Sequence, residues 1–203
     1  MIALLIVICY LIGSIPVAWL VAQLVTGEDL RQMGSGNIGV MNTALSVARW
    51  AGLLVFLTEG AKGAAAVVLA RAWGSDQVTM GLAVLAAVAG TRWSVWLRGA
   101  GGRGNTAGVT AILLLSWPTV VAGLVLWCLA RVLTRRSFFA TRILLAAWPF
   151  LFGLLTQSWR NVAFGAALSL MYLSTQQPET DDHLLIKDRW PNLWEFLTGP
   201  PRG

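Results

Sequence analysis

The sequence predicts an all-α, polytopic membrane protein with about seven transmembrane helices, its N-terminus outside and its C-terminus in the cytoplasm. The composition, the apolar segments and the placement of the basic residues lead to this fold class. Apolar residues make up 57% of the 203 residues and charged residues 12%, whereas a soluble domain carries about 25% charged residues. One soluble core of this size cannot bury that surplus, so we expect most of the chain to lie in lipid.

Each apolar segment is compared with the roughly 20 residues that cross a bilayer as a helix. The first segment follows no basic region and precedes no small-residue cleavage site, so we expect a spanning helix and not a signal peptide. The fourth, sixth and seventh are short, which leaves re-entrant or mismatched crossings open for two of them. The segments are 2–25, 50–72, 78–97, 105–117, 119–134, 141–155 and 160–174.

The basic residues orient these helices, because cytoplasmic loops carry an excess of Lys and Arg. With the N-terminus outside, only Arg71 and Arg160 fall in outer loops, and Lys62 falls within a span. We therefore expect a membrane domain over 1–175 and a cytoplasmic or interfacial tail over 176–203. Twelve basic residues fall on the inner side: Arg31, Arg49, Arg92, Arg98, Arg103, Arg131, Arg135, Arg136, Arg142, Lys187, Arg189 and Arg202.

Several classes of function are disfavoured by the same composition. The net charge is +6, but the cations form no continuous stripe, which favours an anionic leaflet or anionic substrates over nucleic acid. Cys9 and Cys128 lie in apolar runs and are interpreted as small buried hydrophobes. His183 is the single histidine, so a histidine-rich metal site is excluded.

The first inner loop, Gly34–Asn42, reads G-S-G-N-I-G-V-M-N. Three glycines in six residues allow tight turns that present backbone N–H groups as a nest for anions. Ser35 and Asn37 add neutral donors. The alternative is an ordinary Gly/Asn turn between two helices.

The second inner loop runs from Arg98 to Thr106 and interleaves glycines with arginines. Arginine binds phosphate in a bidentate manner, so this composition favours a phosphate site. It is not a Walker A loop, because the G-K-[ST] ending is missing. The alternative is a flexible linker whose arginines follow the positive-inside rule.

Two further features are charged or amphipathic. Glu59 and Lys62 lie within a predicted span, where ionisable residues are functional or paired. Because they are three residues apart, they share a helix face, and a bracing ion pair is as plausible as a substrate contact. In the tail, Lys187–Gly199 contains Pro191 before an apolar pattern that suits a short interfacial helix.

Together these four pieces resemble the bacterial acyl-phosphate:glycerol-3-phosphate acyltransferases, the PlsY family. Gly34–Asn42 is close to the family's G-S-G-N-x-G-A-T-N. Glu59–Gly63 is similar to its acidic-x-x-Lys-Gly, and Gly101–Gly104 to its G-G-K-G. Asn192–Gly199 is similar to N-I-x-R-L-x-x-G in its closing motif.

The resemblance implies a seven-helix enzyme that moves a fatty acyl group from acyl phosphate to the 1-hydroxyl of glycerol 3-phosphate. We separately expect a monomer. The product is lysophosphatidic acid, for phospholipid synthesis, and neither metal nor coenzyme is needed. It assigns catalytic roles to Ser35, Asn37 and Asn42. The substrate-binding residues are Gly34, Gly36, Gly39, Arg49, Lys62, Gly101, Gly102, Arg103, Gly104, Arg189 and Asn192.

The chain departs from the family pattern at several polar positions. Arg49 follows Leu45 by four residues, which places it on the same helix face and makes it a candidate to replace the lost charge. Arg92 and Arg189 are candidates for the same compensation. A divergent enzyme with another acceptor or donor, and a non-catalytic paralogue that binds lipid phosphates, stay open as alternatives. A transporter is weaker, since few polar residues line the spans. The replacements are Met41 for Thr, Leu45 for Arg, Thr91 for His, Ser94 for Pro, Ala100 and Arg103 for Lys, Arg189 for His and Glu195 for Arg.

Overall fold

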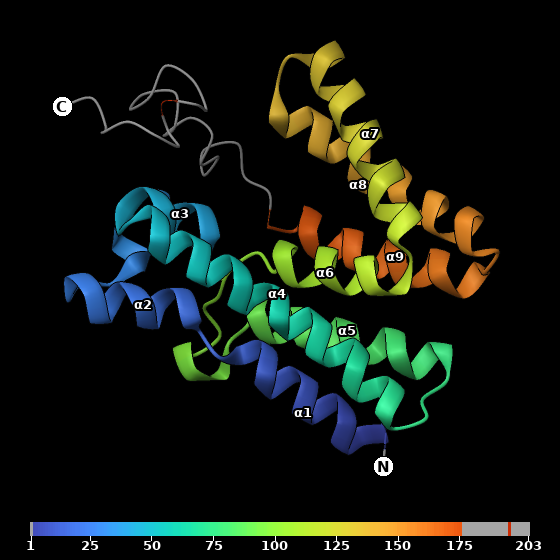
Figure 1. Cartoon of the computed structure of the whole chain (residues 1–203), viewed down its shortest axis with the longest axis horizontal. Coiled ribbons are helices and arrows are strands. Elements are labelled where there is room, and N and C mark those ends of the chain that lie inside the picture. Colours follow the sequence, from blue (N-terminus) through green and yellow to red (C-terminus); the bar gives the residue numbers. More distant parts are fainter. Residues whose placement is uncertain (1, 176–194, 196–203) are drawn as a thin grey trace. The chain divides into compact units, whose positions relative to one another are not determined.

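The computed structural model describes residues 2–175 and residue 195, and within that part every regular element is a helix (Figure 1). Apart from residue 195, the predicted tail, with Arg189 and Asn192, lies outside the described residues. In chain order the elements are α1 (Ile2–Ser14), α2 (Val17–Thr26), the 3-10 turn η1 (Leu30–Gln32), α3 (Val40–Ser46), α4 (Arg49–Ala72), α5 (Gln77–Arg92), the 3-10 turn η2 (Val95–Leu97), α6 (Asn105–Leu115), α7 (Trp117–Thr134), α8 (Ser137–Thr156) and α9 (Trp159–Leu173).

Five helical segments of the described chain are long and apolar enough to cross a membrane. They coincide with the first, second, third, fifth and sixth predicted segments. The sixth was expected to be short, but α8 has 20 residues and carries Pro149 inside it. The fourth and seventh are short, with 11 residues in α6 and 15 in α9. The five segments are Ile2–Thr26, Arg49–Ala72, Gln77–Leu97, Trp117–Thr134 and Ser137–Thr156.

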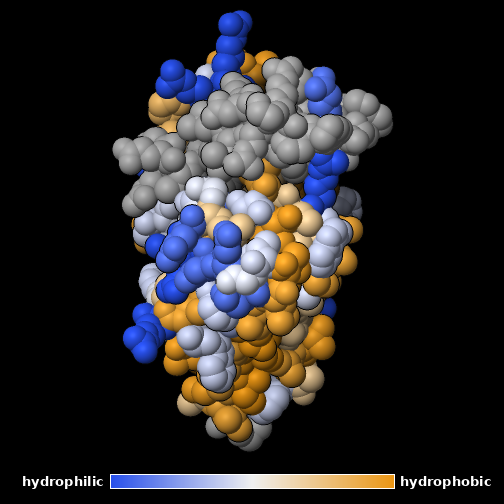
Figure 2. Space-filling model, turned by 90° about the vertical axis from the view of Figure 1, so that its left-hand side faces the viewer, coloured by the Kyte–Doolittle hydropathy of each residue, from blue (hydrophilic) through white to orange (hydrophobic). Residues whose placement is uncertain are grey.

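Apolar side chains on the outside of the helices fit contact with lipid. Figure 2 shows a broad apolar surface, coloured orange, over one face of the molecule. On α7, Leu124, Val132 and Leu133 are all exposed, the last at 83%. Cys128 on the same helix is exposed as well, so its interpretation as a buried residue is wrong. In lipid such a helix needs no polar outer face, and Cys9 on α1 is buried as expected.

The first predicted helix, 2–25, is interrupted between Ser14 and Val17. Pro16 has no backbone N–H to donate, and its ring crowds the preceding turn, so it ends α1 and begins α2. The predicted single helix is therefore wrong at this point. The break is also where the chain passes from one compact unit to another.

The chain forms two compact units, which are described separately below. The larger unit contains residues 2–15 and 59–175, and the smaller contains residues 16–58. In the larger unit, small residues let helices approach closely. A Cβ on Gly13 of α1 would overlap the carbonyl of Ala87 on α5, and one on Gly63 of α4 would overlap the carbonyl of Ala107 on α6.

The core of the larger unit lies around α5. Val84, Ala87 and Val88 of that helix belong to a buried apolar cluster that also contains Leu5 and Cys9 of α1 and residues of α4, α6, α8 and α9. These close contacts hold the chain on both sides of the second inner loop, which joins α5 to α6.

Candidate functional site

The first inner loop belongs to the smaller unit and is held in one conformation by glycine geometry. Gly34 and Gly36 have φ values of +54° and +70°, a region that residues with a Cβ rarely enter. Gly39 is extended and begins α3. The predicted loop 34–42 therefore ends earlier than expected, and Asn42 lies in the first turn of a helix.

Asn42 is fully buried and joins the parts of this loop. Its Nδ2 atom donates toward the carbonyl oxygens of Met33 at 3.0 Å and Asn37 at 2.9 Å, with that of Leu30 at 3.3 Å. Its Oδ1 atom accepts from the N–H of Ser35 at 3.1 Å and from the Ser46 hydroxyl at 3.0 Å. The carboxamide is thus saturated by the protein itself.

The loop's own N–H groups are mostly occupied as well. The N–H of Gly36 donates to Met33, that of Asn37 to the Ser35 hydroxyl oxygen, and that of Gly39 to the Asn37 carbonyl. Because the Ser35 N–H is also used, the predicted nest of free N–H groups is wrong for these four residues. Two polar groups of the loop are left for a ligand: the proton of the half-buried Ser35 hydroxyl and the Asn37 carboxamide. Within the described chain the Asn37 carboxamide makes no hydrogen bond.

The start of the loop is fixed by a carboxylate. Asp29 caps η1, accepting from the backbone N–H and the guanidinium of Arg31 and from the indole N–H of Trp19. The Arg31 side-chain hydrogen bonds, followed by the backbone bond, hold the pKa of Asp29 at about 2, below its ordinary value. Arg31 is therefore paired within the protein, at the edge of the candidate site.

Leu45 and Arg49 do not share a helix. Leu45 is buried near the end of α3, whereas Arg49 is the first residue of α4. The expectation that Arg49 stands one turn beyond Leu45 is therefore wrong. The chain turns between the two helices because they pack closely, and a Cβ on Gly52 would overlap the side chain of Ala44.

The second inner loop belongs to the larger unit and is folded onto the end of α5. The N–H of Gly102 donates to the Thr91 carbonyl at 2.9 Å, and the N–H of Ser94 donates to the Ala100 carbonyl at 3.2 Å. Gly104 then begins α6 with a φ of +73°. These bonds argue against a flexible linker and fix the backbone on both sides of Arg103.

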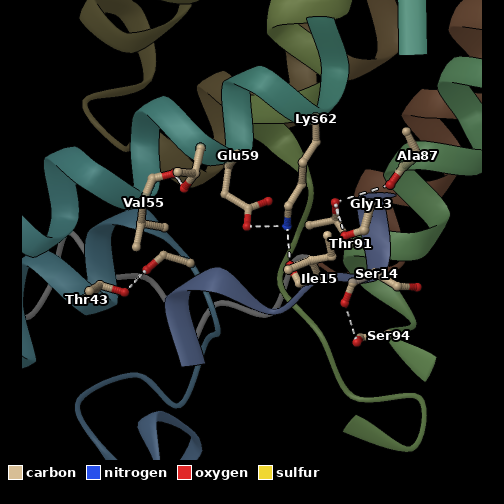
Figure 3. Close-up of polar contacts among 12 residues, drawn as sticks. Gly13, Ser14, Ile15, Thr43, Val55, Glu59, Lys62, Ala87, Thr91 and Ser94 are labelled. Atoms are coloured by element: carbon tan, nitrogen blue, oxygen red, sulfur yellow. Dashed lines mark hydrogen bonds and ion pairs between the residues drawn. The ribbon is translucent and has the colours of Figure 1, made fainter. Parts of the chain in front are cut away.

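Thr91 and Ser94, which stand where the family has His and Pro, form hydrogen bonds within the protein (Figure 3). The Thr91 hydroxyl hydrogen-bonds to the carbonyl oxygens of Gly13 at 3.3 Å and Ala87 at 3.2 Å, and the Ser94 hydroxyl donates to the Ser14 carbonyl at 2.5 Å. Both side chains are buried. They join α1 to the end of α5, a role that nothing in the local sequence indicates.

Glu59 and Lys62 form an ion pair, as one of the two readings predicted (Figure 3). Lys62 Nζ lies 2.6 Å from Glu59 Oε1 and donates to the Ile15 carbonyl, also at 2.6 Å. In an unbroken helix that carbonyl would accept the N–H four residues later. Pro16 ends the helix, and Lys62 supplies the missing donor. Two of the three ammonium N–H groups are therefore used within the protein.

An apolar cavity of about 230 Å³ lies between α6, α7, α8 and α9 in the larger unit. It is connected to the second loop by Tyr172, which lines it and donates from its hydroxyl to the Gly104 carbonyl at 3.3 Å. Gly108, one turn along α6 from Gly104, also lines it. The cavity thus begins about one helical turn from the arginine-bearing loop.

The predicted site residues form two groups in the described chain. Ser35, Asn37 and Asn42 lie together in the smaller unit with Gly34, Gly36, Gly39 and Arg49. Gly101, Gly102, Arg103 and Gly104 lie in the larger unit, as does Lys62. Three or more His, Cys, Asp or Glu side chains that could hold a metal ion are not gathered anywhere in the described residues.

Comparison with known proteins gives the family. The family model described as glycerol-3-phosphate acyltransferase matches residues 3–182. A glycerol-3-phosphate acyltransferase of Synechococcus sp. (strain CC9902) is 37% identical over 170 residues, covering 84% of this chain and 85% of that protein. One of Desulforudis audaxviator (strain MP104C) is 34% identical over 179 residues, covering 88% and 90%.

The fold agrees with a solved structure. It is similar, with a TM-score of 0.79 and 21% identity, to PlsY (YgiH), an integral membrane glycerol 3-phosphate acyltransferase, in its glycerol 3-phosphate form. The similarity covers 97% of this chain and 98% of that one. The resemblance read from the four motifs is confirmed by a family match over most of the sequence, and the chain belongs to the glycerol-3-phosphate acyltransferase family.

Proposed function

We propose that this membrane protein transfers a fatty acyl group from acyl phosphate to the 1-hydroxyl of glycerol 3-phosphate. The hydroxyl oxygen attacks the acyl carbonyl carbon and forms the ester C–O bond. The bond from that carbon to the phosphate oxygen breaks and the hydroxyl proton leaves with the phosphate, so the products are lysophosphatidic acid and inorganic phosphate. The observation that carries the proposal is the arginine loop, fixed at the end of α5, with an apolar cavity one helical turn away.

The reaction depends more on positioning the substrates and stabilising charge than on covalent catalysis, because acyl phosphate is already activated. We assign Arg103 to a substrate phosphate, since a guanidinium binds phosphate through charge-assisted, bidentate hydrogen bonds. Ser35 and Asn37 are assigned as neutral donors to the reacting groups. The acyl chain is assigned to the cavity lined by Gly108, Gly123 and Tyr172. The scheme uses neither metal nor coenzyme.

Asn42 and Lys62 are assigned positioning roles, because their hydrogen bonds are already directed at the protein. Asn42 holds the first loop, and Lys62 holds the end of α1 at the helix break. Arg49, at the start of α4, stays a candidate for phosphate binding. In the tail over 176–203, Arg189 and Asn192 are proposed as further contacts to substrate.

We place both loops on the cytoplasmic face of the cell membrane and propose that the enzyme works as a monomer. The twelve-to-two distribution of basic residues supports this orientation. Cysteine-accessibility labelling at each end of a variant lacking Cys9 and Cys128 tests it. Labelling of the C-terminal end from outside intact cells would overturn the orientation.

The activity itself is tested with purified protein, palmitoyl phosphate and labelled glycerol 3-phosphate, measuring lysophosphatidic acid. We expect turnover by the wild type, a steep rise in a substrate KM for Arg103→Ala, and recovery of much of the activity in Arg103→Lys, because Lys is the family's residue there. A wild type that binds both substrates without turnover would favour the non-catalytic paralogue. Turnover that is indifferent to Arg103→Ala would refute the role of this loop.

A further inference from the structure

The loop from α5 to α6 brings a second arginine, which lies outside the family motifs, beside Arg103. Gly102 donates to the Thr91 carbonyl, and a Cβ on Gly101 would overlap the carbonyls of Thr91 and Arg92. The backbone of the loop is therefore pressed against the last turn of α5, which Arg92 ends. As a result, Arg92 and Arg103 are held near each other at this end of α5.

Arg92 is half-exposed, but the Nε atom of its side chain is not satisfied by the described part of the protein. Its Nε atom is buried and has no hydrogen-bond partner there, and no carboxylate among the described residues forms an ion pair with it. Its guanidinium carbon lies 6.0 Å from the centre of the Trp93 ring, which is no substitute for an acceptor. A buried N–H without an acceptor is costly, and two like charges held together add to that cost.

An arginine at a helix C-terminus is often explained by the helix dipole or by the membrane interface. Either explanation would direct the charged group to water or to lipid headgroups, with its N–H groups solvated. The buried Nε and the neighbouring Arg103 do not fit that picture. A ligand with several anionic oxygens would satisfy the Nε and offset the repulsion between the two cations.

We propose that Arg92 binds a phosphate dianion together with Arg103, as a substrate-binding residue particular to this chain. The inference rests on the proposed function and names the chemistry of the same site. Phosphate fits two guanidinium groups because it presents several oxygens in different directions, whereas a carboxylate offers two in one plane. Both substrates carry such a phosphate, and the experiment separates them.

The variants are Arg92→Gln, Arg92→Lys and, as a matched control, Arg160→Gln, which removes the same charge from an exposed position at the start of α9. Steady-state kinetics are measured with each substrate varied in turn. Calorimetric titration of glycerol 3-phosphate and of inorganic phosphate into the purified protein measures binding without turnover. Thermal unfolding of each variant is followed in parallel.

For Arg92→Gln we expect a KM for one of the two substrates raised about ten- to a hundredfold, the loss typical of a hydrogen bond to a charged group. Phosphate binding weakens in parallel, Arg92→Lys recovers part of it, and Arg160→Gln behaves as wild type. A rise confined to palmitoyl phosphate assigns the donor phosphate, and a rise confined to glycerol 3-phosphate assigns the acceptor.

Unchanged KM values with unchanged phosphate binding would overturn the inference. A lower kcat with unchanged KM and lower thermal stability would overturn it too, because Arg92 would then be structural. If the wild type forms no lysophosphatidic acid, the proposed function fails and the titrations decide this inference alone. Weaker phosphate binding by Arg92→Gln than by the wild type would then support the role of Arg92, and equal binding would refute it.

Discussion

The hydrogen bonds of Asn42 allow a prediction about how the first loop is held. In Asn42→Asp the carboxylate keeps an acceptor for the N–H of Ser35 and the hydroxyl of Ser46. It loses the donor that faces the carbonyls of Met33 and Asn37. Two half-buried carbonyls then face an oxygen where an N–H₂ stood. At about 1–3 kcal/mol for each unsatisfied group, we expect a loss of about 2–6 kcal/mol in the free energy of unfolding.

Asn42→Ala serves as the comparison, because it removes the donor without adding a charge. We expect Asn42→Asp to be at least as destabilised as Asn42→Ala. Ser46→Ala removes a single bond to the same carboxamide and should cost about 1 kcal/mol. Comparing the losses in stability of these variants separates repulsion between the new carboxylate and the loop carbonyls from the loss of side-chain volume.

The assay combines thermal unfolding in detergent, followed by tryptophan fluorescence, with the rate of lysophosphatidic acid formation. In a chain of this size 1 kcal/mol corresponds to about 2–4 °C in Tm, so the two Asn42 variants should fall by at least about 4 °C. Their kcat should fall far more than that of Ser46→Ala, since Ser35 and Asn37 lose their support. An Asn42→Asp protein as stable and active as the wild type would refute the reasoning.

Three further predictions concern other parts of the chain. Lys62→Met leaves the Glu59 carboxylate buried without its cation and should cost about 3–5 kcal/mol; the double variant with Glu59→Gln should recover much of the lost Tm, and an unaltered Tm in Lys62→Met would contradict the ion pair. The pKa of Asp29 is lowered to about 2 from an unfolded value of about 3.9, so its stabilising effect is fully present above about pH 4 and is lost as the pH falls to about 2. Asp29→Asn should remove this pH-dependent component from the Tm values measured over a pH series. Identical pH series for Asp29→Asn and the wild type would count against the Arg31 contact. Gly123→Leu places a side chain in the cavity, so the ratio of rates for lauroyl over palmitoyl phosphate should rise, whereas an unchanged ratio would put the acyl chain elsewhere.

Much of the fold could be predicted because lipid imposes a local rule. A helix that crosses a bilayer needs a long apolar run, and such a run is visible without knowing its neighbours. Five predicted segments agree with long apolar helices in the structure. The family could also be read from short motifs, because Gly34 and Gly36 occupy conformations that favour glycine.

The site was less predictable where a side chain's role depends on what lies opposite it. Arg49 was placed one turn beyond Leu45, but the chain turns between them because Gly52 packs on Ala44. The N–H groups of Ser35, Gly36, Asn37 and Gly39 instead donate to acceptors in the loop and in Met33 just before it. A count of glycines and donors predicts that a loop can bind an anion, but not whether its donors are already used.

That this protein is helical, lies in a membrane and belongs to an acyltransferase family could be predicted without the structure. Those properties depend on composition and short motifs, which are local in the chain. Helix packing decides that Lys62 caps the carbonyl left open before Pro16, and that the Nε atom of Arg92 is buried at the end of α5 without a partner among the described residues. The first contact joins residues 47 positions apart. The chemical state of each side chain therefore depends on helix packing that no neighbouring residue encodes.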